Sequence, residues 1–177
     1  MATELHPIPM GIIVSVLMGI ILTLPISSAA LAISLKLSGL AAGAATVGCA
    51  ANMIGFAVAS YRENGFGGLI AQGIGTSMLQ ISNIIKNPLI WIPAIVASAI
   101  LGPISSQVLR MTSNSIGAGM GTSGLVGQFA MLDTMGASPK TFILIAFMHF
   151  ILPGLISFGV SEWMRKKGFI KKGDMKI

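Results

Sequence analysis

The stretch MTSNSIGAGMGTSGLVGQFAMLDTMG, residues 111–136, decides how this sequence folds. It lies between two strongly apolar stretches, yet it begins with glycines and small polar residues that favour turns over helix. An unpaired backbone N–H or C=O in hydrocarbon costs several kcal/mol, so irregular backbone at membrane depth has to be enclosed by protein or line a water-filled cavity. We therefore predict a re-entrant or broken-helix segment here, folded back into a helical bundle.

A second stretch has the same character. Residues 66–85 read FGGLIAQGIGTSMLQISNII, which mixes apolar residues with four glycines, two glutamines, serine and asparagine. A helix of this composition is a poor lipid-facing span, because glycine and short polar side chains lower helix propensity. The sequence therefore predicts a second re-entrant or broken-helix segment.

The other hydrophobic stretches are long enough to cross a membrane as helices, which takes roughly 20 residues. Pro25 ends the first of them, and Ser27 or Ser28 is placed to cap a short helix that runs to Lys36. The predicted fold class is all-α: a polytopic transmembrane helical bundle with about four spanning helices and two re-entrant or broken-helix segments. The predicted spans are residues 8–24, 38–61, 88–109 and 141–164.

The composition places this bundle in lipid. Hydrophobic residues make up 54% and charged residues 9% of the 177 positions, against a usual charged share of roughly 25%. The mean hydropathy is +0.87. So few charges cannot cover the surface of a soluble domain, where most Lys, Glu, Arg and Asp are found.

The net charge of +6 does not predict nucleic-acid binding, because the basic residues between Lys36 and Lys140 are isolated and form no basic face. The excess comes from the end of the chain, where six of the eleven basic residues lie in the last thirteen positions. A basic cluster just beyond a hydrophobic segment is typical of a cytoplasmic end. We therefore divide the chain into a membrane domain, residues 1–164, and a basic cytoplasmic tail, residues 165–177.

The glycine-rich run GAGMGTSGLVG, residues 117–127, is the leading candidate for a ligand site. Glycine lets backbone approach a ligand closely, and amides without a helical partner can bind anions or sugar hydroxyls. A tight turn that packs helices closely is the alternative. A nucleotide loop is excluded because no lysine follows the run as in a Walker motif. The predicted substrate-binding side chains offer both donors and acceptors; they are Ser113, Asn114, Thr122, Ser123, Gln128, Gln72, Gln80 and Asn83.

Three charged residues border the polar stretches and are candidates for a charged gate: Arg62, Glu63 and Arg110. The alternative for the first two is a solvated loop at a membrane face, and for Arg110 a side chain that reaches the lipid head groups. Asn52 is expected to make an interhelical hydrogen bond. His149 is centred in the last span, where a lone buried histidine is more often a packing residue than a proton carrier.

We expect no catalytic residues, no cofactor and no metal site. The sequence contains no HExxH and no CxxC motif, and no pair of neighbouring carboxylates. Its single cysteine, Cys49, lies in a hydrophobic stretch, where it is expected to act as a small buried hydrophobe. These features argue against hydrolytic and redox chemistry.

Four motifs carry a family resemblance: GIILTLPISSAALAISL (19–35), GLAAGAATVGCAANMIGFAVAS (39–60), ENGFGGLIAQGIGTSMLQ (63–80) and GAGMGTSGLVGQ (117–128). They resemble the bacterial phosphotransferase-system EIIC-like family (EIIC type 2) that includes the perfringolysin regulator protein. The resemblance covers about residues 10–136. Members are usually about twice this length, and the chain is similar to their C-terminal half.

The resemblance implies a sugar-permease-like protein of the bacterial plasma membrane. In related permeases re-entrant hairpins enclose the sugar, the protein forms dimers, and separate IIA and IIB proteins deliver phosphate. The chain itself carries no IIB-like cysteine motif, because Cys49 is intramembrane. A sensor or regulator that binds a ligand without transporting it is the alternative function. A half-permease that needs a second copy or a partner half is a third.

Overall fold

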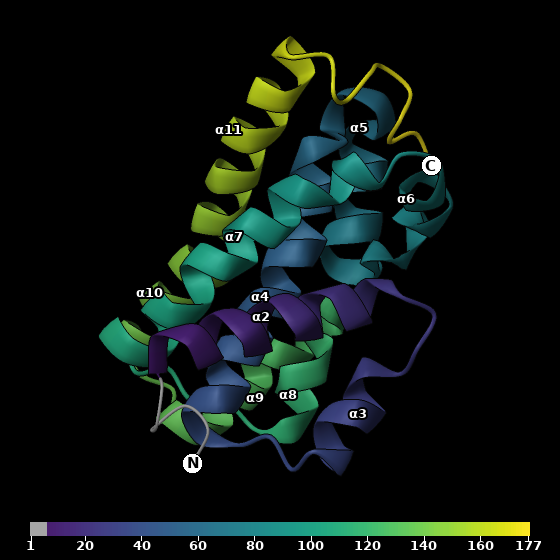
Figure 1. Ribbon diagram of the computed structural model, residues 1–177. Helices are drawn as coiled ribbons and strands as arrows, with labels where there is room; N and C mark the ends of the chain where they lie inside the picture. The colour runs from purple at the N-terminus through teal and green to yellow at the C-terminus, as the bar shows by residue number, and fades with distance from the viewer. Residues whose placement is uncertain (1–6) are drawn as a thin grey trace.

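The computed structural model describes residues 7–177, and every regular element within them is helical (Figure 1). Strand-like pairing in this range is limited to an isolated bridge between Gly39 and Ser113. The elements are α2 (Pro7–Thr23), α3 (Ser28–Ser34), α4 (Gly39–Ala59), α5 (Tyr61–Ile70), η1 (Ala71–Gly75), η2 (Ser77–Gln80), α6 (Ile81–Lys86), η3 (Pro88–Trp91), α7 (Ile92–Pro103), η4 (Ile104–Val108), α8 (Ser115–Met120), η5 (Ser123–Leu125), α9 (Val126–Met135), α10 (Pro139–Ile145), η6 (Ala146–Ile151) and α11 (Leu152–Lys166). The all-α prediction is confirmed.

Three continuous helical stretches are long and apolar enough to cross a membrane: Gly39–Ala59, Pro88–Val108 and Pro139–Lys166. They match the last three predicted spans. The first predicted span, residues 8–24, forms a shorter apolar helix that ends at Thr23, because Pro25 follows. Ser27 caps α3 as expected, since its side chain accepts from the backbone N–H of Ala30 at 3.2 Å.

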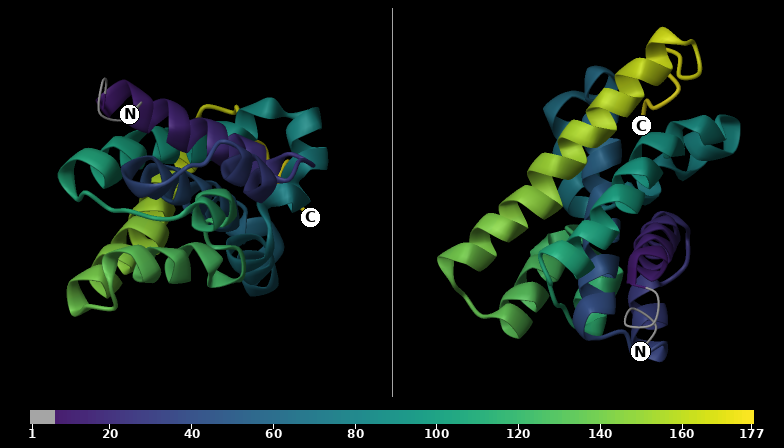
Figure 2. Two further views of the ribbon diagram at one scale, coloured as in Figure 1. Left: turned by 90° about the horizontal axis from the view of Figure 1, so that it is seen from below. Right: turned by 60° about the vertical axis from the view of Figure 1, so that its left-hand side comes forward.

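Helix α4 is the centre of the bundle, and most of its residues are buried. It packs against α2, α7 and α11, and Figure 2 shows these helices crossing around it. Its glycines make this close packing possible, because a Cβ at Gly48 would overlap the backbone of Ser15 on α2. A Cβ at Gly43 would likewise overlap the carbonyl of Met111. Small residues at helix crossings are typical of membrane bundles.

The expected interhelical bond of Asn52 is present. Its Nδ2 donates to Ser98 Oγ at 2.9 Å, and its Oδ1 accepts from Trp91 Nε1 at 3.0 Å. The amide therefore joins α4 to α7 and η3 inside an otherwise apolar interface, where polar contacts between helices contribute roughly 0.6–2 kcal/mol each.

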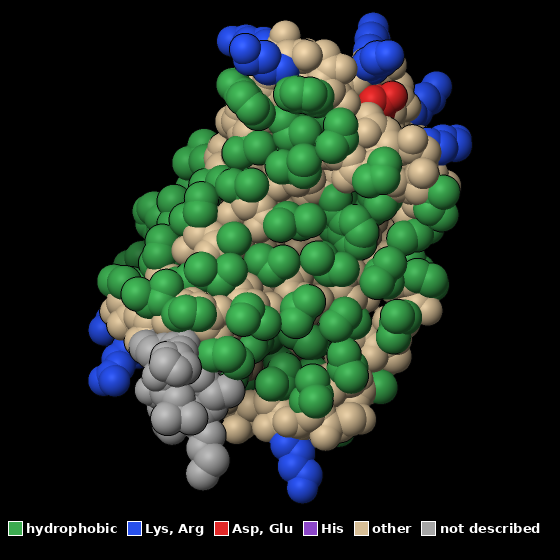
Figure 3. All heavy atoms as spheres, in the orientation of Figure 1, with side chains coloured by type: hydrophobic (Ala, Val, Ile, Leu, Met, Phe, Trp, Pro, Cys, Tyr) green, Lys and Arg blue, Asp and Glu red, His purple; other side chains and the backbone are tan. Residues whose placement is uncertain are grey.

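On the face shown in Figure 3, the charged side chains lie at the two ends of the bundle, and hydrophobic side chains cover the surface between them. One end, which we call the basic end, contains the ion pair that joins Glu63, just beyond α4, to Arg165 at the end of α11. We call the other end the opposite end. It contains Gly39 at the start of α4, which pairs with Ser113, and Lys140 at the start of α10. This distribution is that of a protein surrounded by lipid.

Both polar stretches form broken hairpins. Residues 61–86 (α5, η1, η2, α6), the basic-end hairpin, change from α-helix to a π-helical turn, to extended backbone at Thr76, and then to a 3₁₀ turn. Residues 111–135 (α8, η5, α9), the opposite hairpin, are extended to Asn114 and break again at Gly121, with φ of 55°. The broken-helix prediction is therefore confirmed for both stretches.

Candidate functional site

The tips of the two hairpins meet beside the middle of α4. Thr122 Oγ1 donates to the carbonyl oxygen of Gly73 at 2.5 Å, and Ser123 Oγ donates to that of Gly75 at 2.9 Å. Thr122 also contacts Met53 Sδ at 3.4 Å, which fixes the junction at the level of the central turns of α4. The basic-end hairpin is tied to α2 as well, because Ser77 Oγ and Thr23 Oγ1 are 2.8 Å apart.

Each hairpin starts and finishes at its own end of the bundle. Asn64, near the start of the basic-end hairpin, and Asn87, just after its end, both bond to the segment that follows α11. Thr134 Oγ1, near the end of the opposite hairpin, donates to the carbonyl oxygen of Thr112 at its start, at 2.7 Å. The hairpins thus enter from opposite ends and stop halfway. Figure 1 shows α5 and α6 near one end and α8 and α9 near the other.

Non-helical backbone at the junction is open to the surface of the chain. Gly75 and Gly124 are exposed, and a Cβ placed on Gly75 would meet nothing within 4 Å. Leu125 has a φ of 59°, a left-handed conformation that strains a residue with a side chain. Its exposed fraction is 36%. Strained, irregular backbone at membrane depth is typical of ligand sites, because hydrocarbon cannot satisfy its polar groups.

Of the predicted substrate-binding residues, Thr122 and Ser123 lie at this junction. Asn114 lies at the base of the opposite hairpin, where its Oδ1 accepts from the backbone N–H of Ile116 and of Gly117 and caps α8. Ser113 lies beside it, and its backbone N–H donates to the carbonyl of Gly39 at 3.2 Å. Both residues are therefore displaced from the junction toward the opposite end.

Gln128 pairs with His149, for which the sequence left packing and proton transfer as alternatives. Its Nε2 is 2.7 Å from His149 Nδ1, and both side chains are at least nine-tenths buried. His149 lies in the π-helical turn η6, and such turns in α-helices often occur at functional sites. Within residues 7–177, Gln128 Oε1 and His149 Nε2 have no hydrogen-bond partner. The sequence signal for the interruption of the last span is Pro153, which follows the π turn and has no N–H to donate to the carbonyl of His149.

Gln72, Gln80 and Asn83 form a chain of hydrogen bonds within the basic-end hairpin. Gln80 Nε2 donates to Gln72 Oε1 at 2.8 Å, and Asn83 Nδ2 donates to Gln80 Oε1 at 2.8 Å. This series of hydrogen bonds ends on residues 168–177. We call these residues the return segment because they fold back over the hairpin. Gln80 donates to the carbonyl of Met175 and Asn83 to that of Lys176. These three side chains thus hold the return segment.

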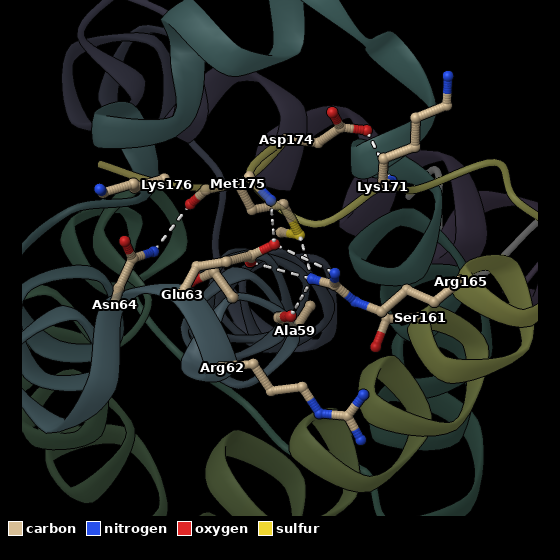
Figure 4. A network of polar contacts seen from close by, with 12 residues as sticks. Ala59, Arg62, Glu63, Asn64, Ser161, Arg165, Lys171, Asp174, Met175 and Lys176 are labelled. Carbon is tan, nitrogen blue, oxygen red and sulfur yellow. Dashed lines mark hydrogen bonds and ion pairs between the residues drawn. The ribbon is translucent and has the colours of Figure 1, made fainter.

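The predicted charged gate is divided between the two ends. Glu63 makes two bonds to Arg165, at 3.1 and 3.0 Å, and its side chain is only 4% exposed. Arg62 pairs with Glu162 at 3.0 Å and is 61% exposed. Arg110 lies at the opposite end, with a φ of 48° where the chain leaves η4. Figure 4 shows the Glu63 carboxylate between Arg165 and the return segment.

The return segment is fixed at both its start and its end. Met175 is fully buried and Ile170 is 2% exposed, both in a cluster with Phe56 and Ile90. The backbone N–H of Lys171 donates to the carboxylate of Asp174 at 2.8 Å and lowers the pKa of that group. The side chain of Asn87 also donates to Asp174, at 2.8 Å. The basic tail predicted at residues 165–177 therefore begins as helix and continues as this packed segment.

Three long apolar helices, an apolar belt and two broken hairpins whose tips meet define a multi-pass helical membrane protein. The family model for the phosphotransferase system EIIC matches residues 1–177, and the chain belongs to this family. The family resemblance seen in the sequence is thereby confirmed. Comparisons with curated proteins and with solved structures return no match.

Proposed function

We propose that the chain is the substrate-handling part of an EIIC-type permease, which binds and translocates a small sugar-like or polyol molecule at the junction of the hairpin tips. The supporting observation is the pair of hydrogen bonds from Thr122 to Gly73 and from Ser123 to Gly75. In the closed junction, the side-chain hydroxyls donate hydrogen bonds to the main-chain carbonyl oxygens. The same groups match the donors and acceptors of a polyhydroxylated ligand.

The opposed hairpins offer a route to alternating access. Transporter sites lie near the bilayer midplane, where discontinuous helices present free backbone groups. Separating one tip from the other would open the junction toward one end of the bundle while the other hairpin keeps the far side closed. The basic end carries most of the Lys and Arg residues, and we assign it to the cytoplasm of a bacterial plasma membrane.

The exposed non-helical backbone at the junction needs a cover in lipid. A second copy of the chain or a partner half would provide it, so we propose that transport requires a homo-oligomer, such as a dimer, or such a partner. IIA and IIB proteins are the proposed phosphate donors. The exposed basic residues of the basic end would be accessible to them on the cytoplasmic side.

Uptake of radiolabelled sugars and polyols into proteoliposomes tests this proposal. The double variant Thr122→Val/Ser123→Ala should reduce uptake about tenfold, the effect of losing hydrogen bonds worth about 1.4 kcal/mol in all. Ser34→Ala is the matched control, since Ser34 is exposed and bonds only within α3. Unchanged uptake by the double variant would exclude the tip junction as the substrate site.

A sensor without transport is the second candidate, favoured by the hydrogen-bonded connection between the basic-end hairpin and the return segment. In a sensor, ligand binding at the junction would change how the return segment packs. Isothermal titration separates the two functions: a sensor binds its ligand while proteoliposome flux is absent. Removing only residues 176 and 177, which takes away the acceptor of Asn83 and leaves Arg165 and Met175 in place, should then abolish signalling and leave ligand binding intact.

A further inference from the structure

A cavity of about 590 Å³ lies at the basic end, between the base of α5 and the start of the return segment. Four basic side chains line it, those of Arg62, Arg165, Lys171 and Lys172. Glu63 is the one acidic residue among the lining residues. The cavity is separate from the hairpin tips, which lie halfway along the bundle.

Positive charge exceeds negative charge around this cavity even after the ion pairs are taken into account. Glu63 is engaged by Arg165, and Glu162 by Arg62. Asp174 lies close to Lys171 but uses its carboxylate to accept a backbone N–H. Among residues 7–177 no carboxylate pairs with the ammonium group of Lys171 or of Lys172. The Nε–H of Arg165 is likewise without an acceptor in this range.

The cavity lies at the level of the lipid head groups. Trp163 is two residues before Arg165, which lines the cavity, and Phe169 lies in the chain between two other lining residues. The two aromatic side chains are 57% and 48% exposed, and their ring centroids are 6.3 Å apart. Exposed aromatic rings at the end of a span mark the membrane–water interface. From Trp163 toward the middle of the span, α11 exposes Phe158 and Leu155, which gives acyl chains an apolar surface to follow.

We propose that this cavity binds the phosphate of an anionic phospholipid, with Lys171, Lys172 and Arg62 around the phosphodiester. Basic pockets between spans on the cytoplasmic side of a membrane have the charge that anionic head groups require. The return segment supplies two of the three cations, so a bound lipid would also hold this segment on the bundle. This site does not depend on the proposed transport function.

Thermal unfolding of the purified protein in a neutral detergent tests the proposal, with phosphatidylglycerol, phosphatidylcholine or inorganic phosphate added. Phosphatidylglycerol should raise the melting temperature, and the other two should not. Lys171→Ala/Lys172→Ala should raise the half-saturating phosphatidylglycerol concentration about 25-fold, because each lysine near an anionic surface contributes about fivefold. Arg62→Gln, which leaves the return segment unchanged, should raise it about fivefold.

Lys166→Ala/Lys167→Ala is the matched control, because it removes the same charge from the same end and neither residue lines the cavity. It should bind phosphatidylglycerol nearly as well as the unmodified chain. An equal loss in the control would overturn the proposal in favour of a general surface potential. A full shift with inorganic phosphate alone would overturn it in favour of a free-phosphate site.

Discussion

The two hairpins have similar outlines but are held by different forces. The basic-end hairpin is fixed at its base by side chains: amides bond the return segment, and Glu63 bonds Arg165 and the backbone N–H of Gly173. The opposite hairpin is held mainly by close backbone contact at glycines. A Cβ on Gly119 would lie 2.5 Å from Ala29 Cα, and one on Gly121 would lie 2.7 Å from Ala50 N.

This difference indicates how each hairpin can be loosened. The side chains that hold the basic-end hairpin are buried, since Glu63 is 4% and Gln80 0% exposed, so removing one partner leaves a buried polar group without a bond. The glycine contacts of the opposite hairpin have no such polar partners, and added side-chain volume disrupts them instead. The predictions below test this contrast.

The largest effect is expected from Glu63→Gln. Arg165 would keep its charge in a site where its side chain is 12% exposed, so the free energy of unfolding should fall by about 3 kcal/mol. Unfolding in mixed detergent micelles measures the change. Glu162→Gln is the control, because its partner Arg62 is 61% exposed and the pair should contribute at most about 1 kcal/mol. Equal losses of unfolding free energy in both variants would show that the buried ion pair stabilises the fold no more than the exposed one.

A smaller effect is expected from Gly119→Ala in the opposite hairpin. The added Cβ meets backbone atoms of α3, so α8 has to shift and the free energy of unfolding should fall by about 2 kcal/mol. Gly67→Ala in the basic-end hairpin is the matched control, because a Cβ there meets nothing within 4 Å. Retained stability of Gly119→Ala would contradict the close packing assigned to the opposite hairpin.

The smallest effect is a pH dependence of the return segment. The bond from the Lys171 N–H holds the pKa of Asp174 below its ordinary value of 3.8. A lowered pKa in the folded state adds stability above the unfolded pKa, and this contribution is lost as the pH falls through the folded value. Hydrogen exchange in residues 168–177, corrected for intrinsic rates, should therefore accelerate as the pH drops below about 3.8. Asp174→Asn should weaken this acceleration, and an unchanged profile would refute the assignment.

Local chemistry in the sequence predicted several features. The sequence predicts Ser27 or Ser28 as a helix cap, because two serines follow Pro25 just before an apolar run, and the structure selects Ser27. Asn52 was recognised as an interhelical contact because it is the one strongly polar side chain in a Gly/Ala-rich span. Both broken segments are predicted because their glycines and short polar side chains lower helix propensity, and irregular backbone at membrane depth has to be enclosed by protein. Each of these inferences needs only neighbours along the chain.

The predicted site residues illustrate what such reasoning misses. Gln72, Gln80 and Asn83 were grouped by their spacing, and they are in fact joined by hydrogen bonds. Their partners are carbonyls of Met175 and Lys176, more than ninety positions away from Gln80 and Asn83. The pairing of Gln128 with His149 was missed for a similar reason, because it joins two helices across a tight turn.

The sequence by itself determined that this chain is a multi-pass helical membrane protein, that its two polar stretches break, and to which family it belongs. The first two properties follow from hydropathy and from the backbone's need for hydrogen bonds, both of which act over a few turns, and the third follows from the four sequence motifs. Only the tertiary structure decided that the hairpin tips meet at Thr122 and Gly73 and that Glu63 pairs with Arg165. Such pairings depend on how helices cross, which is set by the packing of the whole bundle and not by neighbours in the chain.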